Sequence, residues 1–157
     1  MKMNRWGIAC VLAAYAFVLG AAIPFFHAAA APGKAVIQLE ELEWDWVPLP
    51  AAQHRKTGPV PQAVDKIDKS ISKDSIGYVT YFINFDAKAV VTCNCAYSPS
   101  SASMDFGFIS SNGKFYYINV KGGSINQTIG INQAGSYAMA IRNRSSQTVR
   151  VVGFLEF

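Results

Sequence analysis

The strongest constraint on the fold is a regular alternation of large and small side chains in the last third of the chain. From Met104 to Phe157, short apolar runs alternate with small or polar residues, and a turn signal closes each run. Two runs show this clearly: every second position is large in Ile125, Gln127, Ile129 and Ile131, and the last run has Val149, Val151, Leu155 and Phe157 on one side. Because successive side chains of a strand point to opposite faces, the alternation predicts antiparallel strands with one face on a core and one in water.

Turn signals divide the chain at short intervals. Asn112-Gly113, between two alternating runs, is the strongest short-range hairpin signal, and Gly122-Gly123 marks a further turn. Residues 78–85 and 89–97 predict two further strands, and 64–75 predicts a short polar strand. About seven or eight strands at this spacing predict an all-β fold, an antiparallel β-sandwich of the jelly-roll or Ig-like type.

Composition agrees with a single folded β domain. The 157 residues are 51% hydrophobic and 13% aromatic, which supplies enough apolar material for one core and excludes disorder of the whole chain. Charged residues make up only 15% of the chain, below the usual share in soluble domains. This balance is typical of a secreted β protein.

Residues 1–30 have the features of a cleavable signal peptide. Lys2 and Arg5 precede the uncharged apolar run 8–23, Pro24 ends it, and three alanines follow, so we expect cleavage after Ala30. The alternative is an uncleaved anchor over residues 6–26, which would be the only membrane attachment. We therefore expect a secreted or cell-surface protein with a leader at 1–30, an extended N-terminal arm at 31–63 and a sandwich domain at 64–157.

Charge gives no indication of a nucleic-acid partner. Removing residues 1–30 leaves 12 basic and 10 acidic residues, a net charge of +2 in place of +4. The basic residues are scattered along the mature chain and form no single run.

The arm carries two tryptophans and several prolines. Trp44 and Trp46 are two residues apart, so in an extended chain both rings project to the same side. Two coplanar aromatic faces would suit stacking against a sugar, whereas the structural alternative is that both rings plug one end of the core. The prolines from Pro48 to Pro61 predict a loop or extended linker.

Other aromatic residues lie on strand faces opposite the predicted core. These are Tyr78, Phe82, Tyr116 and Phe154. Exposed, they would suit a carbohydrate or a protein partner, with Tyr78 and Tyr116 as the binding candidates beside the two tryptophans. The alternative is that a neighbouring segment, such as the arm, covers them.

Cys93 and Cys95 lie on the same side of one predicted strand. Two buried thiols, a strained disulfide and half of a metal site are the readings this spacing allows. A metal site needs further Cys or His ligands close in sequence, and the mature chain offers none, so we predict no metal and no cofactor.

The sequence contains no catalytic signature. His54 is the only imidazole left after cleavage, too little for a hydrolytic triad. The acidic run from Glu40 to Asp45 has the character of a solvated face, and Asp86 and Asp105 are expected beside turns, where Asp caps the backbone. We assign no catalytic residue and expect a protein that is not an enzyme.

The closing hairpin resembles a known group of modules. Gly135-Ser136-Tyr137, Asn143, the serine pair 145–146 and the run 149–151 are similar to the last hairpin of GOLD-like and bacterial pre-peptidase C-terminal-type sandwiches. The resemblance implies a noncatalytic binding or accessory unit, although this chain lacks the attached enzyme or membrane segment of those families.

The functional expectation is therefore an exported, noncatalytic β-sandwich that binds a carbohydrate or protein at the cell surface or outside the cell. The alternative is a self-assembling surface subunit that adds strands edge to edge, suggested by the strand that ends the chain. A small secreted enzyme and an outer-membrane barrel are further alternatives.

Overall fold

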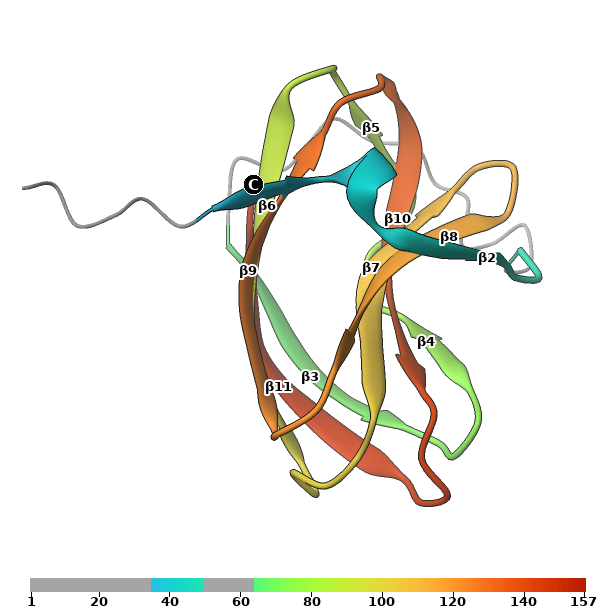
Figure 1. The fold of residues 1–157 in the computed structure, drawn as a ribbon, viewed down its shortest axis with the longest axis vertical. Helices are drawn as coiled ribbons and strands as arrows, with labels where there is room; N and C mark the ends of the chain where they lie inside the picture. The colour runs from blue at the N-terminus through green and yellow to red at the C-terminus, as the bar shows by residue number, and fades with distance from the viewer. Residues whose placement is uncertain (1–34, 50–63) are drawn as a thin grey trace, which may run out of the picture. The chain divides into compact units, whose positions relative to one another are not determined.

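The computed structural model describes residues 35–49 and 64–157, which form two β-sheets (Figure 1). The predicted leader, its cleavage position and His54 lie outside these residues. The three-residue η1 (Leu39–Glu41) is the only helical element in the described part, which thus contains no helix able to cross a bilayer.

The two sheets have five and six strands. The five-stranded sheet has the order β1 (Val36–Gln38), β9 (Ser124–Ile131), β6 (Ala89–Ser98), β11 (Val149–Glu156) and β3 (Asp65–Ile71). The six-stranded sheet has the order β2 (Glu43–Trp46), β8 (Lys114–Val120), β7 (Met104–Ser110), β10 (Gly135–Asn143) and β4 (Ile76–Tyr78), and β5 (Ile83–Phe85) also pairs with β10. The predicted all-β sandwich is therefore confirmed as a fold class.

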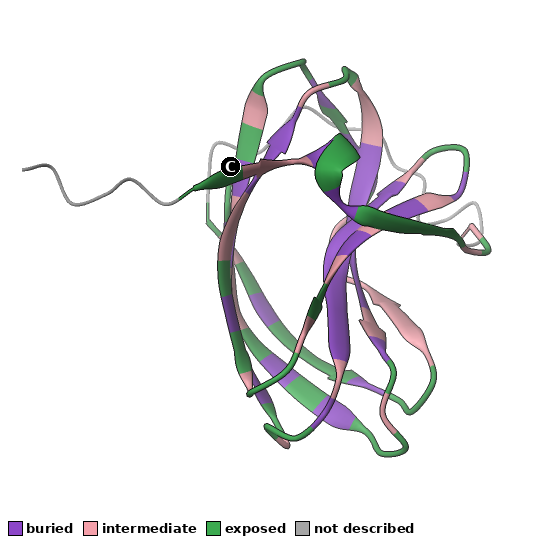
Figure 2. Cartoon of the chain, viewed as in Figure 1, coloured by how far each residue is buried: buried purple, intermediate pink, exposed green. Residues whose placement is uncertain are grey.

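The core lies between the sheets, and in the five-stranded sheet buried positions alternate with more exposed ones along β6 and β11 (Figure 2). Ile129 and Ile131 from β9 and Val149, Val151 and Leu155 from β11 are all buried, as their alternation predicts. From the other sheet, β7 and β10 contribute large apolar side chains to the same core: Met104, Phe106, Phe108, Tyr137, Met139 and Ile141.

Part of the predicted arm belongs to the sheets. β1 pairs with β9 at the edge of one sheet, and β2 pairs with β8 at the edge of the other. The connection through η1 buries Leu39 and Leu42 in the core. The β1–β9 pairing is parallel, so the prediction of a purely antiparallel fold is wrong at this edge. A parallel pair requires a long connection between its strands, and most of the chain lies between β1 and β9.

The predicted strand at residues 78–85 is broken in two. The backbone N–H groups of Val79 and Thr80 both donate to the Met139 carbonyl, at 2.8 and 3.4 Å, and the Thr80 hydroxyl accepts from the Met139 N–H at 2.9 Å. Val79 and Thr80 thus both lie opposite Met139, as in a β-bulge. Tyr81, predicted on the core side, is instead 56% exposed. Breaks of this kind, together with β1 and β2, raise the strand count above the predicted seven or eight.

The six-stranded sheet is apolar on its second face as well. A separate buried cluster lies there, formed by Phe82, Ile109, Phe115, Tyr117, Ala138 and Ala140. Val47, Leu49 and Tyr78 pack against it. Phe82 is therefore buried rather than exposed, and Tyr116 packs against the core between the sheets. Alternation alone could not separate core from surface in this sheet, because both faces carry large side chains.

Candidate functional site

The most exposed aromatic side chains of the described residues include Trp44 and Trp46 on the edge strand β2, at 51% and 61% exposure. In the β2–β8 ladder, Trp44 is opposite Tyr116 and Trp46 is opposite Lys114. Directly opposed residues share a face, and so do residues two apart on one strand. These four side chains therefore form one surface, which we call the aromatic surface.

The two indole rings meet at nearly a right angle. Their centroids are 6.1 Å apart and their planes are inclined by 84°. The prediction that both tryptophans project to the same side is in line with the ladder, but the prediction of coplanar faces is wrong. An edge-to-face pair is the favoured arrangement of neighbouring aromatic rings, and it forms a corner rather than a flat platform.

Lys114 brings a positive charge to this corner. Its Nζ atom lies 4.0 Å from the Trp44 ring centroid and 4.8 Å from the Tyr116 ring centroid. Both distances are within the range of a cation–π contact. The aromatic surface is therefore cationic at its centre.

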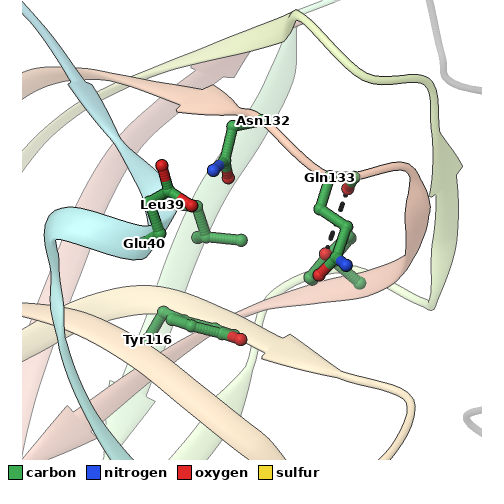
Figure 3. A pocket seen from close by; sticks show the side chains of 6 residues that line it. Leu39, Glu40, Tyr116, Asn132 and Gln133 are labelled. Atoms are coloured by element: carbon green, nitrogen blue, oxygen red, sulfur yellow. Dashed lines mark hydrogen bonds between the residues drawn. The ribbon is translucent and has the colours of Figure 1, made fainter.

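A pocket of about 270 Å³ borders Tyr116. Its remaining lining comes from η1, the β9–β10 turn and β10: Leu39, Glu40, Asn132, Gln133 and Tyr137 (Figure 3). The Tyr137 hydroxyl donates to the Gln133 carbonyl at 3.1 Å, and burial raises the pKa of Tyr137, which keeps that hydroxyl protonated. The pocket thus offers a carboxylate and two amide side chains beside an aromatic ring.

The opposite side of β2 is anchored by a charged network. Asp105, fully buried within β7, accepts hydrogen bonds from Arg142 Nε at 2.7 Å, Arg144 Nε at 2.5 Å and Asn119 Nδ2 at 2.6 Å. The prediction of Asp105 as a turn cap is therefore wrong. Because β7 has an apolar face on each side, the carboxylate requires partners from neighbouring strands.

Arg142 connects this network to the strand β2. Its Nη1 atom donates to Asp45 at 2.9 Å, and its guanidinium group lies 4.7 Å from the Tyr117 ring centroid. Hydrogen bonding to Arg142 lowers the pKa of Asp45. Asp45 lies between the two tryptophans in sequence and points to the other face of β2. The ion pair therefore holds β2 on the face opposite the two tryptophans.

Tyr78 lies apart from the aromatic surface. It is on β4, at the other edge of the six-stranded sheet, and packs against the second buried cluster. Its hydroxyl donates to the Pro48 carbonyl at 2.9 Å, and burial raises its pKa. For this residue, the segment that follows β2 covers the ring, which was the structural alternative.

Cys93 and Cys95 are both buried in the core. Their sulfur atoms are 3.6 Å apart, well beyond the disulfide bond length of about 2.05 Å, so the pair is in the dithiol form. The contact with Cys93 lowers the pKa of the Cys95 thiol. Opposite Cys95, Gly153 leaves room for the sulfur, since a Cβ atom there would come within 2.8 Å of Cys95 Sγ. In residues 35–49 and 64–157, no three His, Cys, Asp or Glu side chains gather as metal ligands.

Of the predicted binding residues, the structure brings together Trp44, Trp46 and Tyr116 and separates Tyr78 from them. Sequence reasoning missed Lys114 and the pocket residues. The position of Lys114 directly after the Asn-Gly turn was a usable signal, because it starts a strand, but its register against Trp46 depends on a long-range pairing.

Neither a protein-family model nor a curated protein matches the chain.

Proposed function

We propose that this chain is an exported, noncatalytic β-sandwich that binds a polysaccharide through the aromatic surface and the neighbouring pocket. The observation that carries the proposal is the pair of exposed tryptophans beside a pocket lined with amide and carboxylate groups. The resemblance of the closing hairpin to accessory modules is in line with a binding role.

The chemistry of the two parts fits a sugar. The faces of a pyranose ring carry C–H groups that pack against indole and phenol rings, and its rim carries hydroxyls that hydrogen-bond to amides and carboxylates. Trp44 and Trp46 supply the first kind of contact, and Asn132, Gln133 and Glu40 supply the second. Two large apolar side chains left exposed on a four-residue strand contribute little to the core, which favours a role in binding.

The strand order supports a jelly-roll form of the sandwich. Without β1 and β2, one sheet has the order β3-β11-β6-β9 and the other β4-β10-β7-β8. This is the order of two Greek keys folded over each other. Export follows from the leader-like residues 1–30, and the site of action is then the cell surface or the extracellular space.

Self-assembly by strand addition is less well supported by the sheet edges. β3, at one edge, exposes Lys66, Asp68 and Lys69, and charged side chains at an edge oppose open-ended pairing. β2, at another edge, has only four residues and is followed by Pro48.

Isothermal titration against a panel of cell-wall glycans tests the proposal. We expect a binding heat with at least one glycan. Trp44→Ala and Trp46→Ala should each lower the affinity about tenfold or more, since one stacked aromatic ring contributes on the order of a tenfold change in affinity. Tyr81→Ala is the control, because Tyr81 is also an exposed aromatic residue but lies outside the surface. No heat with any glycan, or heats unchanged in both tryptophan variants, would overturn the proposal.

A further inference from the structure

We infer that the aromatic surface selects anionic glycans, with the Lys114 ammonium group binding the acidic substituent of a sugar that stacks on the tryptophans. The inference rests on the proposed function and names the class of glycan. It is carried by the position of one lysine within the site.

Lys114 has no acidic partner among the described residues. The four ion pairs found there all involve arginines: Arg142 with Asp45 and with Asp105, Arg144 with Asp105, and Arg150 with Asp68. Asp45 is next to both tryptophans in sequence, but its side chain is on the opposite face and is bound by Arg142. The ammonium group instead lies over the Trp44 and Tyr116 rings.

This arrangement treats neutral and acidic sugars differently. A neutral ring that stacks on the Trp44 face covered by Lys114 displaces the ammonium group and offers it no charged partner in exchange. A sugar that carries a carboxylate or a sulfate forms a charge-assisted hydrogen bond with the displaced ammonium group. The cation therefore favours an anionic ligand at the point where the aromatic contact is made.

The pocket determines which end of the glycan lies at Lys114. Glu40 lines the pocket on the far side of Tyr116 and takes part in no ion pair of the described residues. Its carboxylate repels a second acidic group at that end, whereas Asn132 and Gln133 accept and donate hydrogen bonds to neutral hydroxyls. The acidic substituent is thus placed at Lys114 and the neutral part of the glycan toward the pocket.

The test compares one sugar backbone with and without its charge. Affinity electrophoresis and isothermal titration of the full chain are carried out with polygalacturonate and with its fully methyl-esterified form, and dextran sulfate and dextran form a second charged and neutral pair. The variants are Lys114→Gln, the charge-matched control Lys121→Gln, and Trp44→Ala. Lys121 is an exposed lysine in the turn after β8 and lies outside the aromatic surface.

We expect the wild type to bind the charged member of at least one pair about tenfold more tightly than the neutral member at low salt. Lys114→Gln should remove most of that preference with little change for the neutral member, Lys121→Gln should keep it, and Trp44→Ala should weaken both members. A response to polygalacturonate alone identifies a carboxylate ligand, and a response to dextran sulfate alone identifies a sulfate ligand.

Two failures are distinguishable. Equal affinity for charged and neutral members, with Trp44→Ala still weakening both, overturns the inference and leaves the proposed function standing. A preference that survives Lys114→Gln also overturns it. Binding of polyanions that Trp44→Ala does not weaken indicates general attraction to the net positive charge and overturns the inference, as does the absence of binding to all four polymers; the titrations against the glycan panel then decide the proposed function separately.

Discussion

The two faces of β2 differ in what their side chains do. On one face, Trp44 and Trp46 are exposed, their rings contact each other, and the Lys114 ammonium group lies over the Trp44 ring. On the other face, Asp45 is tied by Arg142 to the buried carboxylate of Asp105. The charged side is therefore the anchored one and the apolar side the open one, the reverse of the usual division in a soluble protein.

The two faces of β2 separate side chains that hold the fold from side chains that are open to a ligand. A buried charge that accepts several hydrogen bonds is costly to remove and has no accessible surface, so it serves the fold. An exposed aromatic residue costs the fold little when it is truncated, and under the proposed function Trp44 and Trp46 serve binding. If the division is correct, mutations on the two faces should have separate effects on stability and affinity.

The largest effect is expected on the anchored face. Asp105→Ala should lower the free energy of unfolding by about 3–5 kcal/mol, because it leaves Arg142, whose side chain is 15% exposed, without its buried partner. Urea denaturation followed by circular dichroism measures this loss. As a control, Asp68→Ala removes the exposed pair with Arg150 and should leave the urea midpoint close to that of the wild type. Equal midpoints for both variants would contradict the difference between the buried and the exposed ion pair.

Tyr116 is the residue where both roles meet. It packs partly against the core, borders the pocket and forms part of the aromatic surface. Tyr116→Ala should therefore lower the free energy of unfolding by about 1–3 kcal/mol and also weaken glycan binding, whereas Trp44→Ala should weaken binding alone. Urea midpoints and titration heats of the two variants, measured side by side, check the distinction. A Tyr116→Ala protein with unchanged glycan affinity would remove this residue from the site.

Asp45 is expected to affect the aromatic surface from the opposite face of β2. Asp45→Ala should weaken glycan binding several-fold without any contact to the ligand, because β2 loses its tie to Arg142 and the tryptophans lose a fixed position. Amide hydrogen exchange of β2 should become faster in this variant, and Asp45→Glu should recover part of the affinity. Unchanged exchange in β2 would show that the pairing with β8 holds the strand without the ion pair.

The smallest effect is expected in acid. Hydrogen bonding to Arg142 holds the pKa of Asp45 below its ordinary value of 3.8, so this ion pair stabilises the fold above that pH and is lost as the pH falls through the folded-state pKa. Asp45→Asn should therefore have a flatter stability profile than the wild type below pH 3.8. Urea midpoints measured in steps across this range test it. Parallel wild-type and variant profiles would contradict a role for this pair.

The sequence allowed the five-stranded sheet to be predicted better than the six-stranded one. In β9 and β11 only one face is buried, so alternation identified Ile129, Ile131, Val149 and Leu155 correctly. In β7 and β8 both faces carry large side chains, and the alternation could not place Tyr116; Phe82, between β4 and β5, packs into the cluster on the second face of the same sheet. The bulge at Val79–Thr80 depends on Met139, about sixty residues away, and has no local signal.

Only part of the candidate site could be predicted from the sequence. The spacing of Trp44 and Trp46 placed both rings on one side, since that follows from strand geometry alone. Their exposure, the right angle between them and the partnership with Lys114 depend on the β2–β8 ladder, which joins segments far apart in the chain. Asp105 was misplaced at a turn because its arginine partners lie almost forty residues later.

The most direct test of the central claim uses the tryptophan indole N–H signals. The chain has three tryptophans, so a Trp6→Phe variant leaves only the two of the aromatic surface. In a ¹⁵N-labelled sample titrated with the tightest-binding glycan, we predict that both indole signals shift in a saturable way while the backbone amides of β3, in the other sheet, stay in place. Indole signals that remain unmoved while glycan binding is detected by titration heat would contradict the account.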